Sequence, residues 1–151
     1  MPTSRKTKTS ILTALPPFVE GTIYELGSGW GTMTLPLAEI YPYNKVIGCE
    51  TSPLPYIISK WRVSSPNLCM LRQDFHLLSL TDAGLVFCYL YPGAMKQLKV
   101  KFESELPEGA WVISNTFAVP GWIAHQVIEV KDIYHTKIYI YKVRKNHPPT
   151  V

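Results

Sequence analysis

The chain has 151 residues, of which 46% are hydrophobic and 17% are charged, and its formal net charge is +4. This composition excludes an intrinsically disordered chain and a coiled coil, and the length fits a single domain over residues 1–151 with its own hydrophobic core. Residues 1–10 and 137–147 carry basic residues and no acid, so we expect flexible basic tails at residues 1–9 and 144–151 around an acidic body.

Apolar segments alternate with helical segments through the first 117 residues. A short helix is predicted from Ser10, which would cap it, to Leu15, because Pro16 ends it. Strands are predicted at residues 22–26, 45–49, 68–73, 83–90 and 110–117. Helices are predicted at residues 32–41, from a cap at residues 51–53 to about Val63, and at residues 94–105. Near-continuous apolar strands separated by helices predict a parallel sheet that is covered on both faces.

The end of the chain has a different pattern. Residues 126–131 and 137–143 alternate between apolar and polar side chains, and the five residues between them suit an antiparallel hairpin. Residues 118–125 are too few for the crossover helix that a further parallel strand would need. The predicted fold is therefore α/β and Rossmann-like, with a mostly parallel sheet and a C-terminal antiparallel hairpin at one edge.

A glycine-rich turn joins the first predicted strand to the following helix. The turn reads Gly27-Ser28-Gly29-Trp30-Gly31, and such a turn lets a nucleotide-like ligand approach the backbone and the free N–H groups of the helix N-terminus. Glu50 follows Gly31 by nineteen residues at the tip of the next strand, where a carboxylate can accept hydrogen bonds from ribose hydroxyls. The two signals together predict a nucleotide-type site.

The glycine spacing selects among nucleotide ligands. The dinucleotide pattern G-x-G-x-x-G fails because Thr32 stands at its sixth position, and the Lys-Ser/Thr pair of a P-loop is absent. The chain has instead Glu25-x-Gly27-x-Gly29-x-Gly31. This pattern closely resembles motif I of the class I S-adenosylmethionine-dependent methyltransferases. An acidic strand tip also suits a cationic sulfonium ligand better than a pyrophosphate.

The resemblance covers residues 20–117 and implies a class I methyltransferase sheet with S-adenosylmethionine as the cofactor. It implies that Glu25 and the loop of Gly27, Ser28, Gly29 and Gly31 hold the methionine end. Glu50 would bind the ribose, and Asp74 with Phe75 would bind the adenine. Tyr89 and Tyr91 would face the sulfonium and the substrate, and they are the candidates for guiding the nucleophile.

Two further stretches resemble a narrower group. Glu25-Leu26-Gly27-Ser28-Gly29 with Gly48-Cys49-Glu50 and Arg62, followed by Phe117-Ala118-Val119-Pro120-Gly121-Trp122, is similar to small methyltransferases that modify lysines of ATP synthase subunit c and adenine nucleotide translocase. That resemblance implies a protein lysine as the acceptor, with Phe117, Pro120 and Trp122 at the substrate site.

Several alternatives stay open from the sequence. An RNA or small-molecule methyltransferase fits the basic ends, and a non-catalytic cofactor-binding subunit fits a domain of this size. A homodimer or a partner protein would then complete the substrate site. Asp74 is also a common turn residue, the two tyrosines could simply pack, and the Pro-Gly-Trp loop could be purely structural. The four histidines show no metal-ligand spacing, so no metal is expected.

Location is the last inference. No apolar run approaches the roughly 18 residues of a membrane span, and the apolar stretch after the basic start ends at Pro16-Pro17, too early for a signal peptide. Cys49, Cys69 and Cys88 lie about twenty residues apart in apolar segments with no CxxC, as expected of buried, reduced thiols. We therefore expect a cytoplasmic protein without a membrane span.

Overall fold

The computed structural model describes residues 3–29, 31–62 and 64–145, and Val63, where the third helix was expected to end, lies outside them. Its strands are β1 (Thr22–Leu26), β2 (Val46–Cys49), β3 (Leu68–Leu71), β4 (Ala83–Cys88), β5 (Trp111–Asn115), β6 (Gln126–Glu129) and β7 (Lys137–Lys142). Its helices are α1 (Arg5–Ala14), α2 (Thr34–Ile40), α3 (Pro53–Arg62) and α4 (Pro92–Glu105), with a 3₁₀ turn, η1 (Phe75–Leu77).

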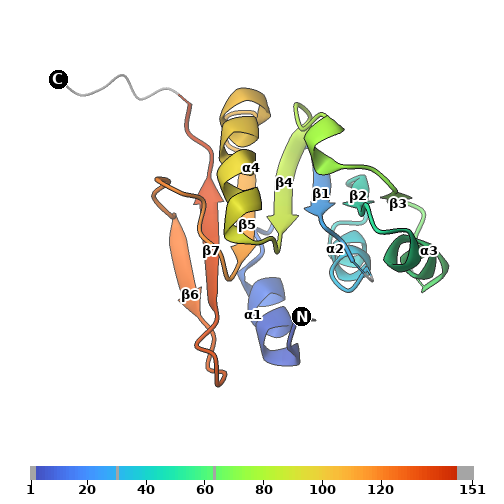
Figure 1. The fold of residues 1–151 in the computed structure, drawn as a ribbon, viewed down its shortest axis with the longest axis horizontal. Coiled ribbons are helices and arrows are strands. Elements are labelled where there is room, and N and C mark those ends of the chain that lie inside the picture. The colour runs from blue at the N-terminus through green and yellow to red at the C-terminus, as the bar shows by residue number, and fades with distance from the viewer. Residues whose placement is uncertain (1–2, 30, 63, 146–151) are drawn as a thin grey trace.

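The strands form one sheet in the order β3-β2-β1-β4-β5-β7-β6 (Figure 1). Strands β1 to β5 run parallel, whereas β7 is antiparallel to both β5 and β6. The predicted α/β sheet with an antiparallel hairpin at one edge is confirmed, and residues 118–125 indeed contain no helix. The parallel arrangement places the carboxyl ends of β1, β2, β4 and β5 at one edge of the sheet, where ligands bind in folds of this kind.

Alternating strand residues feed two separate apolar layers, one on each face of the sheet. One layer joins Ile23, Leu85 and Phe87 to Ile11 of α1 and Leu37 of α2. The other layer contains the residues of the opposite face and is closed by η1 and α4, with these members: Leu26, Val86, Cys88, Val112, Met95, Leu98 and Phe102. Every residue of β1 and β4 is buried, which explains why these strands are apolar throughout.

The start of the chain departs from expectation. The predicted helix start at Ser10 is wrong, because α1 begins at Arg5, where the hydroxyl of Ser4 accepts a hydrogen bond from the Thr7 N–H at 3.1 Å. Residues 5–9, expected in a flexible tail, form the first turns of this helix and bury Thr7. A serine N-cap satisfies a free N–H group and so favours this earlier start. At the other end, the Lys145 N–H donates to Glu108 at 2.5 Å, and residues 146–151 of the expected tail lie outside the described residues.

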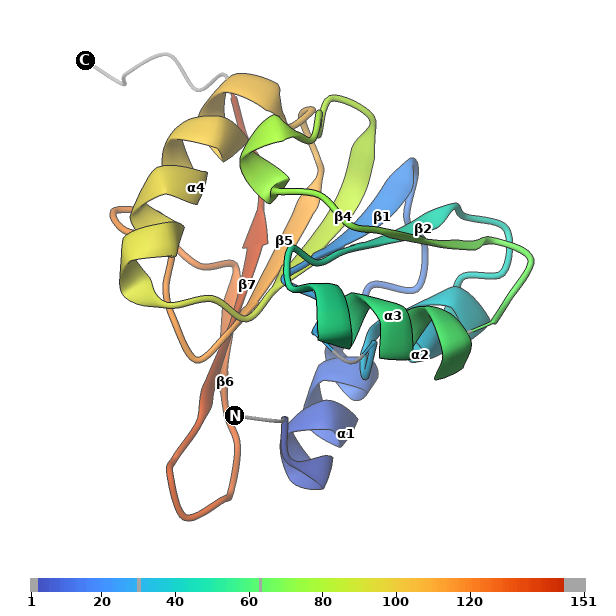
Figure 2. The ribbon, with the colours of Figure 1, turned by 45° about the vertical axis from the view of Figure 1, so that its right-hand side comes forward.

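The edge of the sheet next to α1 is extended by the β6–β7 hairpin, which reaches beyond the other strands (Figure 2). Cys49 and Cys88 are buried, whereas Cys69 on the edge strand β3 is exposed, so the expectation of three buried thiols is wrong for Cys69. None of the helices in the described part of the chain has the length and apolar character needed to span a membrane.

Candidate functional site

The glycine loop leaves β1 with an unusual backbone. Gly27, Gly29 and Gly31 have φ values of +69°, +53° and +78°, which residues other than glycine rarely adopt. A Cβ added to Gly29 would have no atom within 4 Å, whereas one on Gly27 would lie 2.8 Å from Leu90. The loop therefore presents open backbone at Gly29 and packs closely at Gly27 against the segment that follows β4.

Glu25 lies at the base of this loop, in the buried strand β1, with 5% of its surface exposed. The Thr34 hydroxyl at the start of α2 donates a hydrogen bond to its carboxyl group. Burial raises the pKa of Glu25 to about 8, and the charge of Glu50 adds to the rise, against the effect of the Thr34 hydrogen bond. A buried acid of this kind is neutral near pH 7 and becomes ionised most readily beside a cation.

Glu50 joins the glycine loop to the start of α3. Its Oε2 accepts the Gly29 N–H at 2.7 Å, and its Oε1 accepts the Ser52 N–H at 3.0 Å. Each carboxylate oxygen has two lone pairs, so both oxygens can still accept hydrogen bonds from a ligand. Glu50 thus stands beside the open loop in an orientation that two backbone groups hold in place.

Ser28 provides an independent sign of a polar ligand. Its hydroxyl is buried and has no hydrogen-bond partner among the described residues. An unpaired buried hydroxyl is costly, and such groups in native structures usually mark an absent water or ligand. An open glycine backbone, a buried acid suited to a cation, a free serine hydroxyl and a carboxylate for ribose hydroxyls together fit S-adenosylmethionine.

Asp74 and Phe75 lie at the start of η1. Asp74 is exposed, and its Oδ1 accepts the His76 N–H at 2.9 Å, so it also acts as the turn residue considered above. Phe75 is half-buried against the apolar layer under α4. The predicted adenine pair therefore lies on one short element after β3, with one carboxylate oxygen of Asp74 already engaged.

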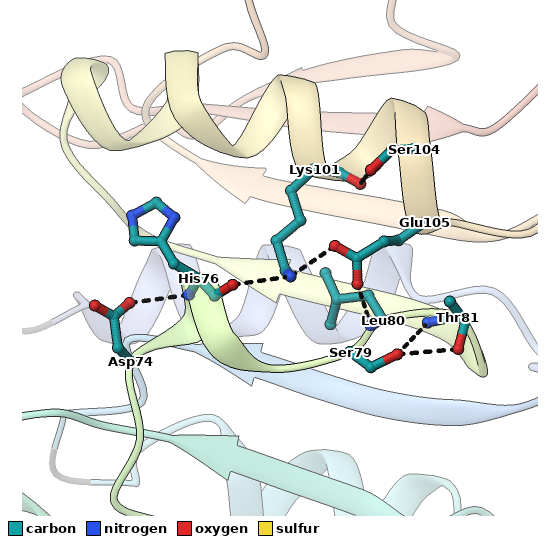
Figure 3. A network of polar contacts seen from close by, with 8 residues as sticks. All are labelled: Asp74, His76, Ser79, Leu80, Thr81, Lys101, Ser104 and Glu105. Atoms are coloured by element: carbon teal, nitrogen blue, oxygen red, sulfur yellow. Dashed lines mark hydrogen bonds and ion pairs between the residues drawn. The ribbon is translucent and has the colours of Figure 1, made fainter.

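Side chains of α4 hold η1 in position (Figure 3). Lys101 donates to the His76 carbonyl at 3.3 Å and pairs with Glu105 at 2.6 Å, while Glu105 accepts the Leu80 N–H at 3.0 Å. Partial burial alone would raise the pKa of Glu105, but the hydrogen bonds from Lys101 and Leu80 hold that pKa below its usual value. The adenine side of the site is thus fixed to the helix that follows β4.

The two candidate tyrosines differ in their surroundings. Tyr89 is half-buried directly after β4 and lines a pocket, whereas Tyr91 is 66% exposed as the residue preceding α4. Leu90 between them contacts the Gly27 side of the loop. Tyr89 therefore lines the pocket and Tyr91 does not, and Leu90 next to Tyr89 lies against the glycine loop.

The predicted substrate residues 117, 120 and 122 are not gathered at that pocket. Trp122 packs on Phe102 and Tyr141 with ring centroids 6.0 and 5.7 Å apart, and its Nε1 donates to Glu103 at 3.0 Å. Phe117 is half-buried against the same apolar layer, and Pro120 is exposed. This loop covers part of the face beside α4, and Trp122 lines a second pocket of about 650 Å³ there.

Sequence reasoning missed a pocket of about 390 Å³ next to Tyr89, here called the Asn115 pocket. It is bounded by the ends of β4 and β5, the start of α1, and the turn between β6 and β7. Its residues are Thr3, Ser4, Thr7, Tyr89, Asn115, Thr116, Asp132, Tyr134, His135, Thr136 and Lys137. They come from both ends of the chain, so no local motif could have revealed them.

With this geometry in view, the family can be assigned. The family model described as "ANTKMT methyltransferase domain" matches residues 25–126, about two thirds of the chain. The chain belongs to this family. The resemblance stated from the motifs is thereby confirmed, and the family is that of an S-adenosylmethionine-dependent methyltransferase domain.

Two curated relatives extend the match beyond the domain. The chain is 30% identical over 132 residues to the adenine nucleotide translocase lysine N-methyltransferase of Mus musculus, covering 85% of this chain and 56% of that protein. It is 25% identical over 154 residues to a protein-lysine N-methyltransferase of Saccharolobus islandicus, covering 95% and 92%. The chain thus spans little more than half of the mouse relative and nearly all of the archaeal one.

Solved structures agree on the fold. An RNA methyltransferase from Salinibacter ruber in complex with S-adenosyl-L-homocysteine superposes with a TM-score of 0.86 at 19% identity, covering 99% of this chain and 97% of that one. A precorrin-6y C5,15-methyltransferase from Geobacter metallireducens gives 0.70 at 12% identity, covering 92% and 88%. The whole described sheet, including the hairpin, therefore has the class I methyltransferase arrangement.

Proposed function

We propose that this protein transfers a methyl group from S-adenosylmethionine to the side-chain amine of a lysine in another protein. The observation that carries the proposal is the pair of relatives, each named as a lysine methyltransferase, which align with 85% and 95% of this chain. The cofactor side rests on the family and on the geometry of Glu25, Ser28, Gly29 and Glu50.

The chemistry asks little acid–base work of the protein. When bound, S-adenosylmethionine supplies a methyl group on a sulfonium, so that the lone pair of the lysine nitrogen forms the new N–C bond while the C–S bond breaks. The residues proposed to hold the methionine end are Glu25 and the loop of Gly27, Ser28, Gly29 and Gly31. Glu50 would hold the ribose, and Asp74 with Phe75 would hold the adenine.

The acceptor side must align the nitrogen and exclude water, which can supply roughly 7–11 kcal/mol of the barrier. Tyr89 is the proposed guide for the nucleophile because it lines the pocket beside the loop; Tyr91 is the outer candidate on the exposed rim. Phe117, Pro120 and Trp122 lie outside this pocket; we propose them as a surface that contacts the substrate protein away from the reacting lysine, so their loss should change turnover little.

An RNA acceptor is the second candidate. Two observations favour it: the Salinibacter ruber structure described as an RNA methyltransferase covers nearly all of this chain, and both ends of the chain are basic. A small-molecule acceptor is favoured only by the precorrin-6y methyltransferase, whose TM-score of 0.70 is lower than that of the RNA methyltransferase, and a non-catalytic cofactor-binding role has no such observation in its favour.

One labelling experiment separates these candidates. The purified protein is incubated with methyl-labelled S-adenosylmethionine and a cell extract, and samples are then treated with protease or with ribonuclease. Lysine methylation predicts that protease releases the label and that hydrolysis yields methyllysine. Release by ribonuclease would instead establish RNA methylation, and cofactor binding without any transfer would indicate the non-catalytic role.

We also propose that residues 1–151 act as one methyltransferase domain and that the protein works in the cytoplasm. A second copy or a partner chain is proposed to border the substrate site. Light scattering of the purified protein, with and without cofactor, tests for the second copy. Fractionation of cells tests the compartment.

A further inference from the structure

The Asn115 pocket is connected to the glycine loop through the residues that follow β4. Tyr89 on its wall is followed by Leu90, whose side chain lies against the Gly27 turn of the cofactor loop. The pocket and the loop are therefore separated by the single segment that follows β4. The opposite wall is built by the start of α1 and by the β6–β7 turn, which lie beside each other at this edge of the sheet (Figure 2).

Asn115, at the end of β5, is the most deeply buried polar residue that lines the pocket, with 2% of its surface exposed. Its Oδ1 accepts a hydrogen bond from the Thr116 hydroxyl at 3.0 Å, and its side-chain amide has no other partner among the described residues. An amide oxygen has two lone pairs and an amide nitrogen has two N–H groups. One acceptor position and the N–H groups of Asn115 are therefore available to a ligand.

The backbone around Asn115 is strained in a way that fixes its position. In the part of the chain that the structure describes, Thr116 and His135 are the residues other than glycine with positive φ, +73° and +48°, and both line this pocket. A β-branched residue rarely adopts such an angle. Thr116 is held there because its N–H donates to the Lys137 carbonyl at 2.7 Å, and the next N–H, of Phe117, donates to the Asn115 carbonyl at 2.9 Å. Strain of this kind concentrates at functional sites.

The charged and titratable groups around the pocket come from three elements. Tyr89 follows β4. The β6–β7 turn contributes Asp132, Tyr134 and His135, and Lys137 begins β7. Residues 3 and 4, which precede α1, and Thr7 within α1 contribute only hydroxyl side chains. Asp132 accepts from the Thr136 N–H at 2.9 Å and from its hydroxyl at 2.6 Å, and these bonds lower the pKa of Asp132. The Nδ1 atom of His135 lies 3.1 Å from Oε1 of Glu129. The pocket thus combines one fixed carboxylate, the basic side chains of His135 and Lys137, and two tyrosines whose hydroxyls can accept N–H groups.

We propose that the Asn115 pocket receives the acceptor lysine side chain and that the Asn115 amide oxygen, together with the Tyr89 hydroxyl, accepts the N–H groups of the neutral amine. Two acceptors that hold both N–H groups leave the nitrogen lone pair directed away from them, toward the cofactor loop. Asn115 is thereby a positioning residue for the nucleophile. This inference rests on the proposed lysine methyltransferase function.

The first test measures binding without catalysis. Protein labelled with ¹⁵N and saturated with S-adenosyl-L-homocysteine is titrated with Nα-acetyl-lysine methylamide and observed by NMR. We expect the side-chain amide signals of Asn115 and the backbone signals of Thr116 to shift. Nα-acetyl-norleucine methylamide, which lacks the amine, should produce at most a small fraction of that shift. Equal shifts with both probes, or shifts confined to other surfaces, would overturn the assignment.

The second test uses single-turnover rates between pH 6.5 and 9.5 with the lysine substrate identified by labelling. The wild-type rate should rise about tenfold per pH unit below the pKa of the bound amine, because only the neutral form attacks. Asn115→Asp adds a carboxylate that stabilises the ammonium form of the bound lysine. The pH dependence of the single-turnover rate should therefore shift to higher pH by about one unit or more. Asn115→Leu should lower kcat tenfold or more through loss of alignment, with unchanged affinity for S-adenosyl-L-homocysteine.

Gln126→Glu is the matched control, because it adds the same charge at the end of β6 away from the turn and should leave the profile in place. Melting curves of each variant identify any that fail to fold, and the NMR titration of the wild-type protein stands without them. If the wild-type protein binds S-adenosyl-L-homocysteine and methylates lysine while both Asn115 variants behave like it, the inference is wrong and the proposed function stands. If the wild-type protein methylates no lysine, the proposed function itself fails.

Discussion

The two sides of the site are built in opposite ways. The proposed cofactor side, residues 22–77, is a continuous stretch in which Glu25 lies within β1 and the other proposed groups follow the strand that positions them. The acceptor side joins residues 3–7 to residues 115–116 and 132–137, which meet only because β7 inserts antiparallel next to β5. A site formed by one contiguous segment leaves a motif, and a site formed by distant segments does not.

The forces that hold the two sides also differ. On the cofactor side, backbone conformation dominates: left-handed glycines and N–H groups bonded to Glu50 shape the loop. On the acceptor side, left-handed backbone at Thr116 and His135 fixes the frame, but the polar groups that face the pocket are side chains, including Asn115, Asp132 and Thr136. Substitutions should therefore separate the two sides, with backbone changes abolishing cofactor binding and side-chain changes altering turnover.

The largest effect is expected for Gly29→Val. Nothing in the protein lies within 4 Å of the added Cβ, so the new side chain would occupy the space proposed for the cofactor, and affinity for S-adenosylmethionine should fall by a hundredfold or more. The left-handed backbone adds about 1–2 kcal/mol of strain. Gly109→Val is the matched control, because Gly109 has φ +81° and equally open surroundings. Calorimetry should show the same loss of stability in both and loss of binding in Gly29→Val alone.

Glu50→Ala should cause the second-largest effect, a loss of affinity for S-adenosylmethionine. A carboxylate that accepts hydrogen bonds contributes about 1.5–3 kcal/mol, which is a ten- to hundredfold change in affinity. The Gly29 and Ser52 N–H groups also lose their partner, so the loop should become more mobile. Glu39→Ala on the exposed side of α2 serves as the control. Titration calorimetry that finds wild-type affinity in Glu50→Ala would remove this residue from the cofactor side.

The third effect is a pH dependence. Since the pKa of Glu25 is raised to about 8 in the cofactor-free protein, binding a cationic cofactor below that pH must expel a proton. Affinity should therefore rise with pH, by at most about tenfold per unit, between pH 6 and 7.5. Glu25→Gln should remove this dependence and bind more weakly. Calorimetry in buffers of different ionisation enthalpy would detect the released proton, and an equal pH slope in both proteins would contradict the assignment.

The smallest effect on turnover is expected for Trp122→Leu. Because this side chain packs on Phe102 and Tyr141 and bonds Glu103, its loss should lower the free energy of unfolding by about 1–3 kcal/mol. Turnover at a temperature where the variant is folded should stay within about twofold of wild type, in contrast to Asn115→Leu. A large loss of turnover with normal stability would return Trp122 to the acceptor side.

These comparisons explain what the sequence could reveal. The succession of strands and helices along the chain and the C-terminal hairpin follow from apolar periodicity and segment lengths. The glycine loop and Glu50 follow from local spacing, whereas the roles proposed for Glu25, Asp74 and Phe75 come from the family resemblance. The start of α1 was missed because Ser4 and Ser10 are equally good caps, and only the burial of Thr7 and Ile11 distinguishes them. The sequence pattern places Asn115 in an apolar strand at residues 110–117. Nothing nearby in the sequence indicates that residues 3–7 and 132–137 face it.

The position of the β6–β7 hairpin at the end of the sheet order has one more consequence. Strand β7 pairs with β5 and buries Ile138, Ile140 and Tyr141. In the described part of the chain β6 pairs with β7 alone, so β6 can open locally at a lower free energy than the central strands β1 and β4. Its amides should exchange with deuterium before those of the central strands do. The β6–β7 turn, which lines the proposed acceptor pocket, then adjoins a less stable strand than the glycine loop does, so gentle warming should weaken acceptor recognition before it weakens cofactor binding.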